Sequence, residues 1–91
     1  MQIYEVRISH AALLDMTSLQ RFLDEMLSED NAKMLSLFAG LYGKTTSKAL
    51  LAIHPEARRM ISHNRRWIYV FHIEENFAIV DRILPAKMNK G

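Results

Sequence analysis

The alternation of apolar and polar positions is clearest in the last third of the chain. In residues 67–73 the aromatic side chains recur at every second position, and Ile68 and Val70 stand between them. A strand that is apolar on both faces is expected to be central in its sheet. The polar residues 74–76 follow, and a second apolar run occupies 77–84. Two β-rich runs around a short polar turn predict a β-hairpin.

Two amphipathic helices are predicted before this hairpin. Residues 2–8 first alternate like a strand with one buried face. Apolar residues at three-to-four spacing then predict a helix that begins after Ser9 and reaches Leu27. A second stripe of the same spacing predicts helix over 31–53. Glycine is unfavourable inside a helix, so Gly43 leaves open whether this segment is one bent helix or two.

The order of these elements predicts an α+β fold. Pro55 ends the second helix, and residues 60–62 are expected to form a short strand before the hairpin. The predicted order is strand, helix, helix, strand, strand, strand, with an antiparallel-rich sheet and a helical hairpin packed on one face. A chain of 91 residues is expected to form a single domain, 1–91. Residues 85–91 are expected to form a loose tail after the last strand.

Composition narrows the functional classes. The chain contains no cysteine, which excludes a disulfide framework and a thiolate site. It has no run of 18 apolar residues and no charged segment before an apolar one at its start. We therefore expect a cytoplasmic protein with no membrane span and no signal peptide.

The histidines give no sign of a metal centre. None of His10, His54, His63 and His72 has the spacing of a helical metal site, and we expect neither a metal nor a cofactor. His72 is expected to be structural, on the sheet face of Ile68 and Val70. His63, in a turn among arginines, is the better candidate for acid–base chemistry.

Basic residues gather in the last third of the chain, although the net charge is only +2. Six of them are candidates for binding nucleic acid or another target: Arg58, Arg59, Arg65, Arg66, Arg82 and Lys87. In a hairpin the start of one strand and the end of the other share one end of the sheet, so Arg66 should lie near Lys87. Such a cluster can bind phosphate or an acidic protein segment. A solvated rim without a ligand is the alternative.

Four features of the sequence, taken in order, resemble the RelE/ParE superfamily of bacterial toxins from type II toxin–antitoxin systems. They are the opening strand Tyr-Glu-Val-Arg-Ile-Ser at 4–9, the helical pair, the turn His-Pro-Glu-Ala-Arg-Arg at 54–59, and the strand end Val-Asp-Arg-Ile-Leu at 80–84. The likeness extends over nearly the whole chain.

The resemblance implies a growth-inhibiting toxin of the plasmid-stabilisation type that is neutralised by a cognate antitoxin, as a homodimer or a toxin–antitoxin hetero-oligomer. Arg66 and Lys87 match basic family positions, but Met88 replaces a second base and no Tyr or His follows Ile83. These departures favour the ParE-like members, which bind DNA gyrase without catalysis.

Two other functions stay open within the resemblance. One is a RelE-like endoribonuclease that cleaves mRNA on the ribosome, with His63, Arg66 and Lys87 as its catalytic residues. The other is an inactive homologue that acts only as an antitoxin-binding protein.

Overall fold

The fold is built on a four-stranded mixed sheet. The computed structural model describes residues 3–18 and 26–86. Within them the sheet has the order β1-β4-β3-β2, with β1 parallel to β4 and the other neighbours antiparallel. The strands are β1 (Glu5–Ile8), β2 (Arg58–Ile61), β3 (Trp67–Glu74) and β4 (Phe77–Pro85). The predicted α+β class is confirmed at this level.

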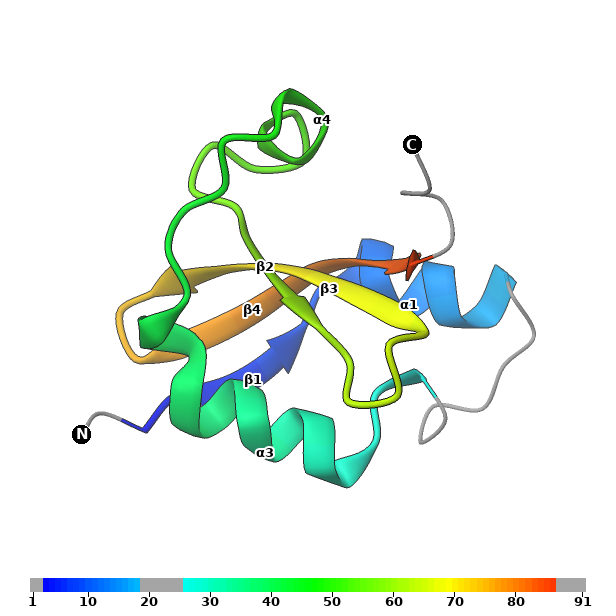
Figure 1. Cartoon of the computed structure of the whole chain (residues 1–91), viewed down its shortest axis with the longest axis horizontal. Coiled ribbons are helices and arrows are strands. Elements are labelled where there is room, and N and C mark those ends of the chain that lie inside the picture. Colours follow the sequence, from blue (N-terminus) through cyan, green and yellow to red (C-terminus); the bar gives the residue numbers. More distant parts are fainter. Residues whose placement is uncertain (1–2, 19–25, 87–91) are drawn as a thin grey trace.

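The helices of the described residues precede β2 in the chain (Figure 1). They are α1 (His10–Ser18), α3 (Glu29–Phe38), a 3-10 turn (Ala39–Leu41) and α4 (Lys48–Leu51). The predicted first helix begins where α1 does. Its expected continuation over 19–25 lies outside the described residues.

The predicted hairpin is confirmed. The strands β3 and β4 pair from Trp67 opposite Pro85 to Glu74 opposite Phe77. The connection between them is two residues long, and Glu75 takes the left-handed backbone conformation, with φ of 58°. Each face of β3 is covered, which agrees with its apolar pattern on both sides.

The two faces of the sheet have separate cores. On one face Tyr69 and Phe71 pack with residues of α1 and α3, and Leu35 of α3 is fully buried there. On the other face Ile68 and Val70 pack against Leu50 and the chain that follows α4. Figure 1 shows α3 below the sheet and α4 above it.

This arrangement differs from the expected helical hairpin on one face. The segment 31–53 is two helices rather than one, because α3 ends at Phe38 and α4 begins at Lys48. Between them Lys44 makes a bridge to Arg58 at the outer edge of β2, so the chain passes around that edge to the second face. The Ser47 side chain then accepts a hydrogen bond from the Leu50 N–H and starts α4.

Tyr69 ties β3 to the segment before α3. Its side chain is fully buried, and its hydroxyl donates a hydrogen bond to the Met26 carbonyl. Burial raises the pKa of the Tyr69 phenol above its ordinary value, because the ionised form would lose its hydration. The folded protein therefore holds this proton more tightly than the unfolded chain does.

We predict that Tyr69→Phe lowers the free energy of unfolding by about 1–3 kcal/mol at neutral pH, because the Met26 carbonyl loses a buried donor. A folded-state pKa above the unfolded value means that the contribution is present below about pH 10 and is lost as the pH rises above it. Urea unfolding of both proteins at pH 8 and at pH 11 measures this. A difference between them that stays constant with pH would contradict the prediction.

Candidate functional site

The turn between β2 and β3 presents two arginines on a well-fixed backbone. The Ser62 hydroxyl accepts hydrogen bonds from two backbone N–H groups of this region, that of Arg66 among them. Arg65 is held in the left-handed conformation, with φ of 62°. The Asn31 side chain of α3 accepts a hydrogen bond from the His63 N–H, at 2.8 Å. The side chains of residues 63–66 are exposed, and the guanidinium groups of Arg65 and Arg66 are without an internal partner among the described residues.

The start of β3 and the end of β4 share one end of the sheet, as the hairpin predicts. The Ala86 N–H donates to the Arg66 carbonyl at 2.9 Å, next to the pair formed by Trp67 and Pro85. Lys87, which was predicted to lie beside Arg66, is outside the described residues.

Two of the other candidate arginines are used within the fold. Arg58 donates through Nη1 to the carbonyl oxygen of Tyr42, at 2.8 Å. Arg82 donates through Nε and Nη2 to the two carboxylate oxygens of Asp15, at 2.7 and 2.8 Å. Arg59 is exposed but stands opposite Val70, roughly 13 Å along β3 from Arg66. The structure therefore divides the predicted basic cluster.

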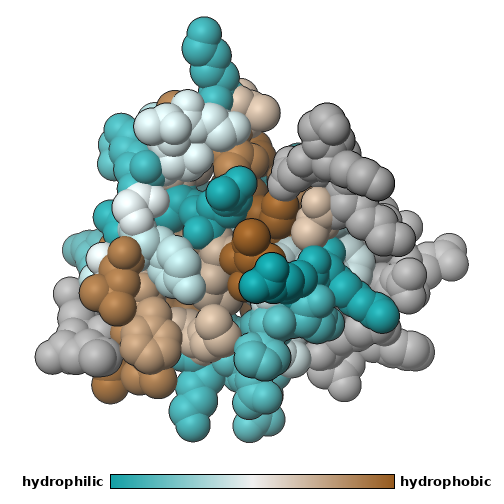
Figure 2. Space-filling view, viewed as in Figure 1, coloured by the Kyte–Doolittle hydropathy of each residue, from teal (hydrophilic) through white to brown (hydrophobic). Residues whose placement is uncertain are grey.

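An apolar groove adjoins the arginine turn. It has a volume of about 250 Å³ and is lined by Asp30, Lys33, Met34, Leu37, Phe38 and His63. His63 thus belongs to both the turn and the groove. Close by along the chain, Leu41 is 78% exposed. Figure 2 shows apolar side chains gathered over the end of α3 and the 3-10 turn.

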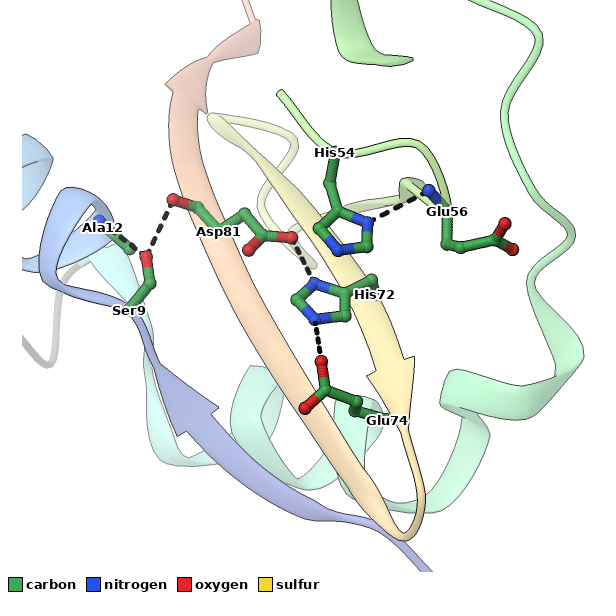
Figure 3. A network of polar contacts seen from close by, with 7 residues as sticks. All are labelled: Ser9, Ala12, His54, Glu56, His72, Glu74 and Asp81. Atoms are coloured by element: carbon green, nitrogen blue, oxygen red, sulfur yellow. Dashed lines mark hydrogen bonds and ion pairs between the residues drawn. The ribbon is translucent and has the colours of Figure 1, made fainter. Parts of the chain in front are cut away.

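A second polar cluster lies on the opposite face of the sheet, around His72 (Figure 3). His72 is buried, and its Nδ1 lies 2.6 Å from Oδ2 of Asp81. Its Nε2 lies 3.3 Å from Oε2 of Glu74. The ring of His54 stacks on that of His72 with centroids 3.7 Å apart and planes within 5°. Nδ1 of His54 accepts a hydrogen bond from the Glu56 N–H, at 3.0 Å.

An extra residue in β4 brings Asp81 to this cluster. Val70 pairs with Arg82, but the next residue of β3, Phe71, pairs with Val80. Asp81 between them has no partner across the strands, which is the pattern of a β-bulge. Its side chain points to His72 (Figure 3).

The helix α1 covers the edge of β4 beyond this bulge. Because β1 ends at Ile8, the edge of β4 after Val80 has no neighbouring strand in the described sheet. The Ser9 hydroxyl donates to the Asp81 carbonyl at 2.9 Å, and Oδ2 of Asp15 accepts from the Ile83 N–H at 3.0 Å. The hydrogen bonds that the guanidinium donates to Asp15 raise the pKa of Arg82.

This cluster was not predicted from the sequence. The predicted position of His72 on the face of Ile68 and Val70 is confirmed, but no partners were predicted for it and no metal ligands were expected. His54, His72 and Asp81 come from three separate segments, so no local spacing connects them. The β-bulge that directs Asp81 toward His72 contains no glycine, so the sequence gives no local sign of it.

Comparison of the chain with protein-family models, with curated proteins and with solved structures finds no match. Among the described residues, no helix has both the length and the apolar character that crossing a bilayer requires.

We predict that Asp15→Ala costs more stability than Arg82→Ala. Removal of the carboxylate leaves both the guanidinium and the Ile83 N–H without their acceptor, at a cost of about 2–4 kcal/mol. Removal of the half-exposed Arg82 side chain leaves Asp15 bonded to the Ile83 N–H and costs about 1 kcal/mol. Urea denaturation measures both values. Equal losses would show that the bond to the Ile83 N–H adds nothing.

Proposed function

We propose that this protein is a RelE/ParE-like toxin that inhibits growth by binding DNA gyrase and that a cognate antitoxin neutralises. The observation that supports a binding role is the continuity of the arginine turn with the apolar groove through His63. Arginine beside exposed aromatic and aliphatic side chains is the composition of energetically important protein–protein contacts. The chain order, in which a strand and helices precede three strands, is the order that the resemblance implies.

Charge supports a protein target over a nucleic acid. The net charge is +2, and the guanidinium groups of Arg58 and Arg82 donate hydrogen bonds to other groups of the fold. A protein that docks on ribosomal RNA gains its affinity from many phosphate contacts. Arg65 and Arg66 offer two such contacts at the turn, whereas a protein interface needs only a few anchoring side chains.

The groove along α3 suits the antitoxin. Met34, Leu37 and Phe38 line it, and Leu41 extends the exposed apolar surface. An amphipathic helix binds such a groove with side chains spaced by three and four residues. An antitoxin helix in this position lies beside Arg65 and Arg66 and blocks access to the turn, which explains neutralisation in a hetero-oligomer.

The alternative function is ribosome-dependent cleavage of mRNA. It is favoured by the common position of His63 and Arg66 on one rigid turn, at the end of the sheet from which the chain continues to Lys87. In this role the cations stabilise the charge that develops on the cleaved phosphate, and His63 transfers a proton. An inactive homologue that only binds antitoxin is the third candidate.

For the gyrase function we predict that induced expression arrests growth and that the purified protein blocks supercoiling by gyrase. Loss of two anchoring arginines should weaken inhibition in the Arg65→Ala/Arg66→Ala variant by about 30-fold or more. The matched control is Arg7→Ala, an exposed arginine on the edge strand β1. Normal supercoiling at saturating wild-type protein would reject the gyrase function, and harmless overexpression would favour the inactive homologue.

For the ribonuclease function we predict mRNA cleavage only when ribosomes are present. Cleavage should fall by about 100-fold in His63→Ala and in Arg66→Ala, which remove a proton-transfer group and a charge-stabilising group. Primer extension on a defined transcript, with and without ribosomes, measures this, and Arg7→Ala again serves as the control. Intact transcripts after induction would exclude this function.

A further inference from the structure

The cluster around His72 contains three groups that are typical ligands of a transition-metal ion. One ring nitrogen from each of His54 and His72 and one carboxylate oxygen of Asp81 all lie within 4.8 Å of one another. Two imidazoles and one carboxylate are a common protein ligand set for zinc, with a fourth position left for water. Figure 3 shows the three side chains converging from the loop after α4, from β3 and from β4.

We propose that His54, His72 and Asp81 bind a divalent ion of the zinc class and that Glu74 positions His72 for it. The inference is independent of the toxin proposal, because the ligands lie on the other face of the sheet from the α3 groove and well along β3 from the arginine turn.

The two ring nitrogens of His72 each face a carboxylate, Nδ1 toward Asp81 and Nε2 toward Glu74. A neutral imidazole has one N–H and one lone pair. With the N–H on Nε2, facing Glu74, the lone pair of Nδ1 points toward the Asp81 carboxylate. A metal ion between Nδ1 and that carboxylate would be bound by both groups.

Glu74 then has the role of a supporting carboxylate. It accepts a hydrogen bond from the Nε2–H of His72 and leaves Nδ1 to bind the metal. Metal-bound histidines commonly donate their other N–H to a carboxylate in this way, which fixes the tautomer and strengthens the ligand. Glu74 and His72 lie on the same strand two residues apart, so their side chains project from the same face.

The three proposed ligands differ in how firmly the fold holds them. His72 is fixed by its pairing with Ile79. Asp81 is fixed by the paired residues on either side of the bulge and by the hydrogen bond that its carbonyl accepts from the Ser9 hydroxyl. Their ligand atoms are 2.6 Å apart and must separate to roughly 3.3 Å around a tetrahedral zinc ion. The ring of His54 stacks parallel to that of His72, and its Nδ1 accepts a hydrogen bond from the Glu56 N–H. Because a neutral imidazole has one lone pair, this ring must turn and give up that bond to bind the ion. His54 is partly exposed and lies in the loop after α4.

Occupancy of this site would join the α4 segment to the sheet. His54 follows α4, whereas His72 and Asp81 belong to β3 and β4. Ile68 and Val70 lie beneath the same segment. A bound ion therefore acts as a clamp over the second core, and it should raise the thermal stability of the protein.

The test is titration of the 91-residue chain with Zn²⁺ after treatment with a chelator. We expect one ion per chain by isothermal titration calorimetry and a rise in the unfolding temperature. The partly exposed His54 is the safe ligand to remove, because His72 is buried and its loss endangers folding.

Four variants separate this site from adventitious binding. His54→Ala and Asp81→Asn should each weaken Zn²⁺ binding by about 100-fold or more, and Glu74→Gln by about 10- to 100-fold. His63→Ala, which removes an exposed histidine outside the cluster, should bind like the wild type. Absence of binding by the wild type, or unchanged affinity in His54→Ala with its fold verified by circular dichroism, would overturn the proposal.

Discussion

The bulge in β4 is the constraint on which the rest of the structure depends. In a regular strand Val80 and Ile83 would face opposite sides of the sheet, because side chains alternate. The extra residue resets the alternation, so that both side chains enter the core beneath α1 and α3. Leu84 then packs in the second core. The same residue, Asp81, is directed to His72, so one insertion sets both the packing of the C-terminal strand and the polar cluster.

Because β1 is short, part of the edge of β4 has no neighbouring strand, and side chains make hydrogen bonds to it instead. An unpaired strand edge invites association with other chains. Here the Ser9 hydroxyl supplies the donor and the Asp15 carboxylate the acceptor that a neighbouring strand would otherwise provide. These contacts join residues that are far apart in the chain. Ser9 and Asp81 are separated by 72 positions, and Asp15 and Ile83 by 68 positions. The end of the hairpin therefore reaches its full stability only after the N-terminal strand and helix have docked on it.

The hairpin and the buried central strand were predictable, because period-two patterns bounded by polar turns have few other solutions. The division of residues 31–53 into two helices on opposite faces of the sheet was not predictable. Leu35 and Leu50 are equally apolar, and the spacing of apolar residues does not indicate that they pack on opposite faces of the sheet. The cluster at His72 escaped prediction for a related reason. It depends on a register shift, and hydrophobic alternation near Asp81 does not reveal the shift.

The arginine turn and the histidine cluster use different parts of one strand. Arg66 immediately precedes β3, and His72 lies six residues later, roughly 20 Å along an extended chain. The turn is braced by Asn31 of α3, whereas the cluster is completed by the loop after α4. The two supports belong to different cores on different faces of the sheet. A ligand bound at His72 would therefore stabilise the α4 segment without reshaping the turn, and a partner bound to the turn would leave the histidine cluster uncovered.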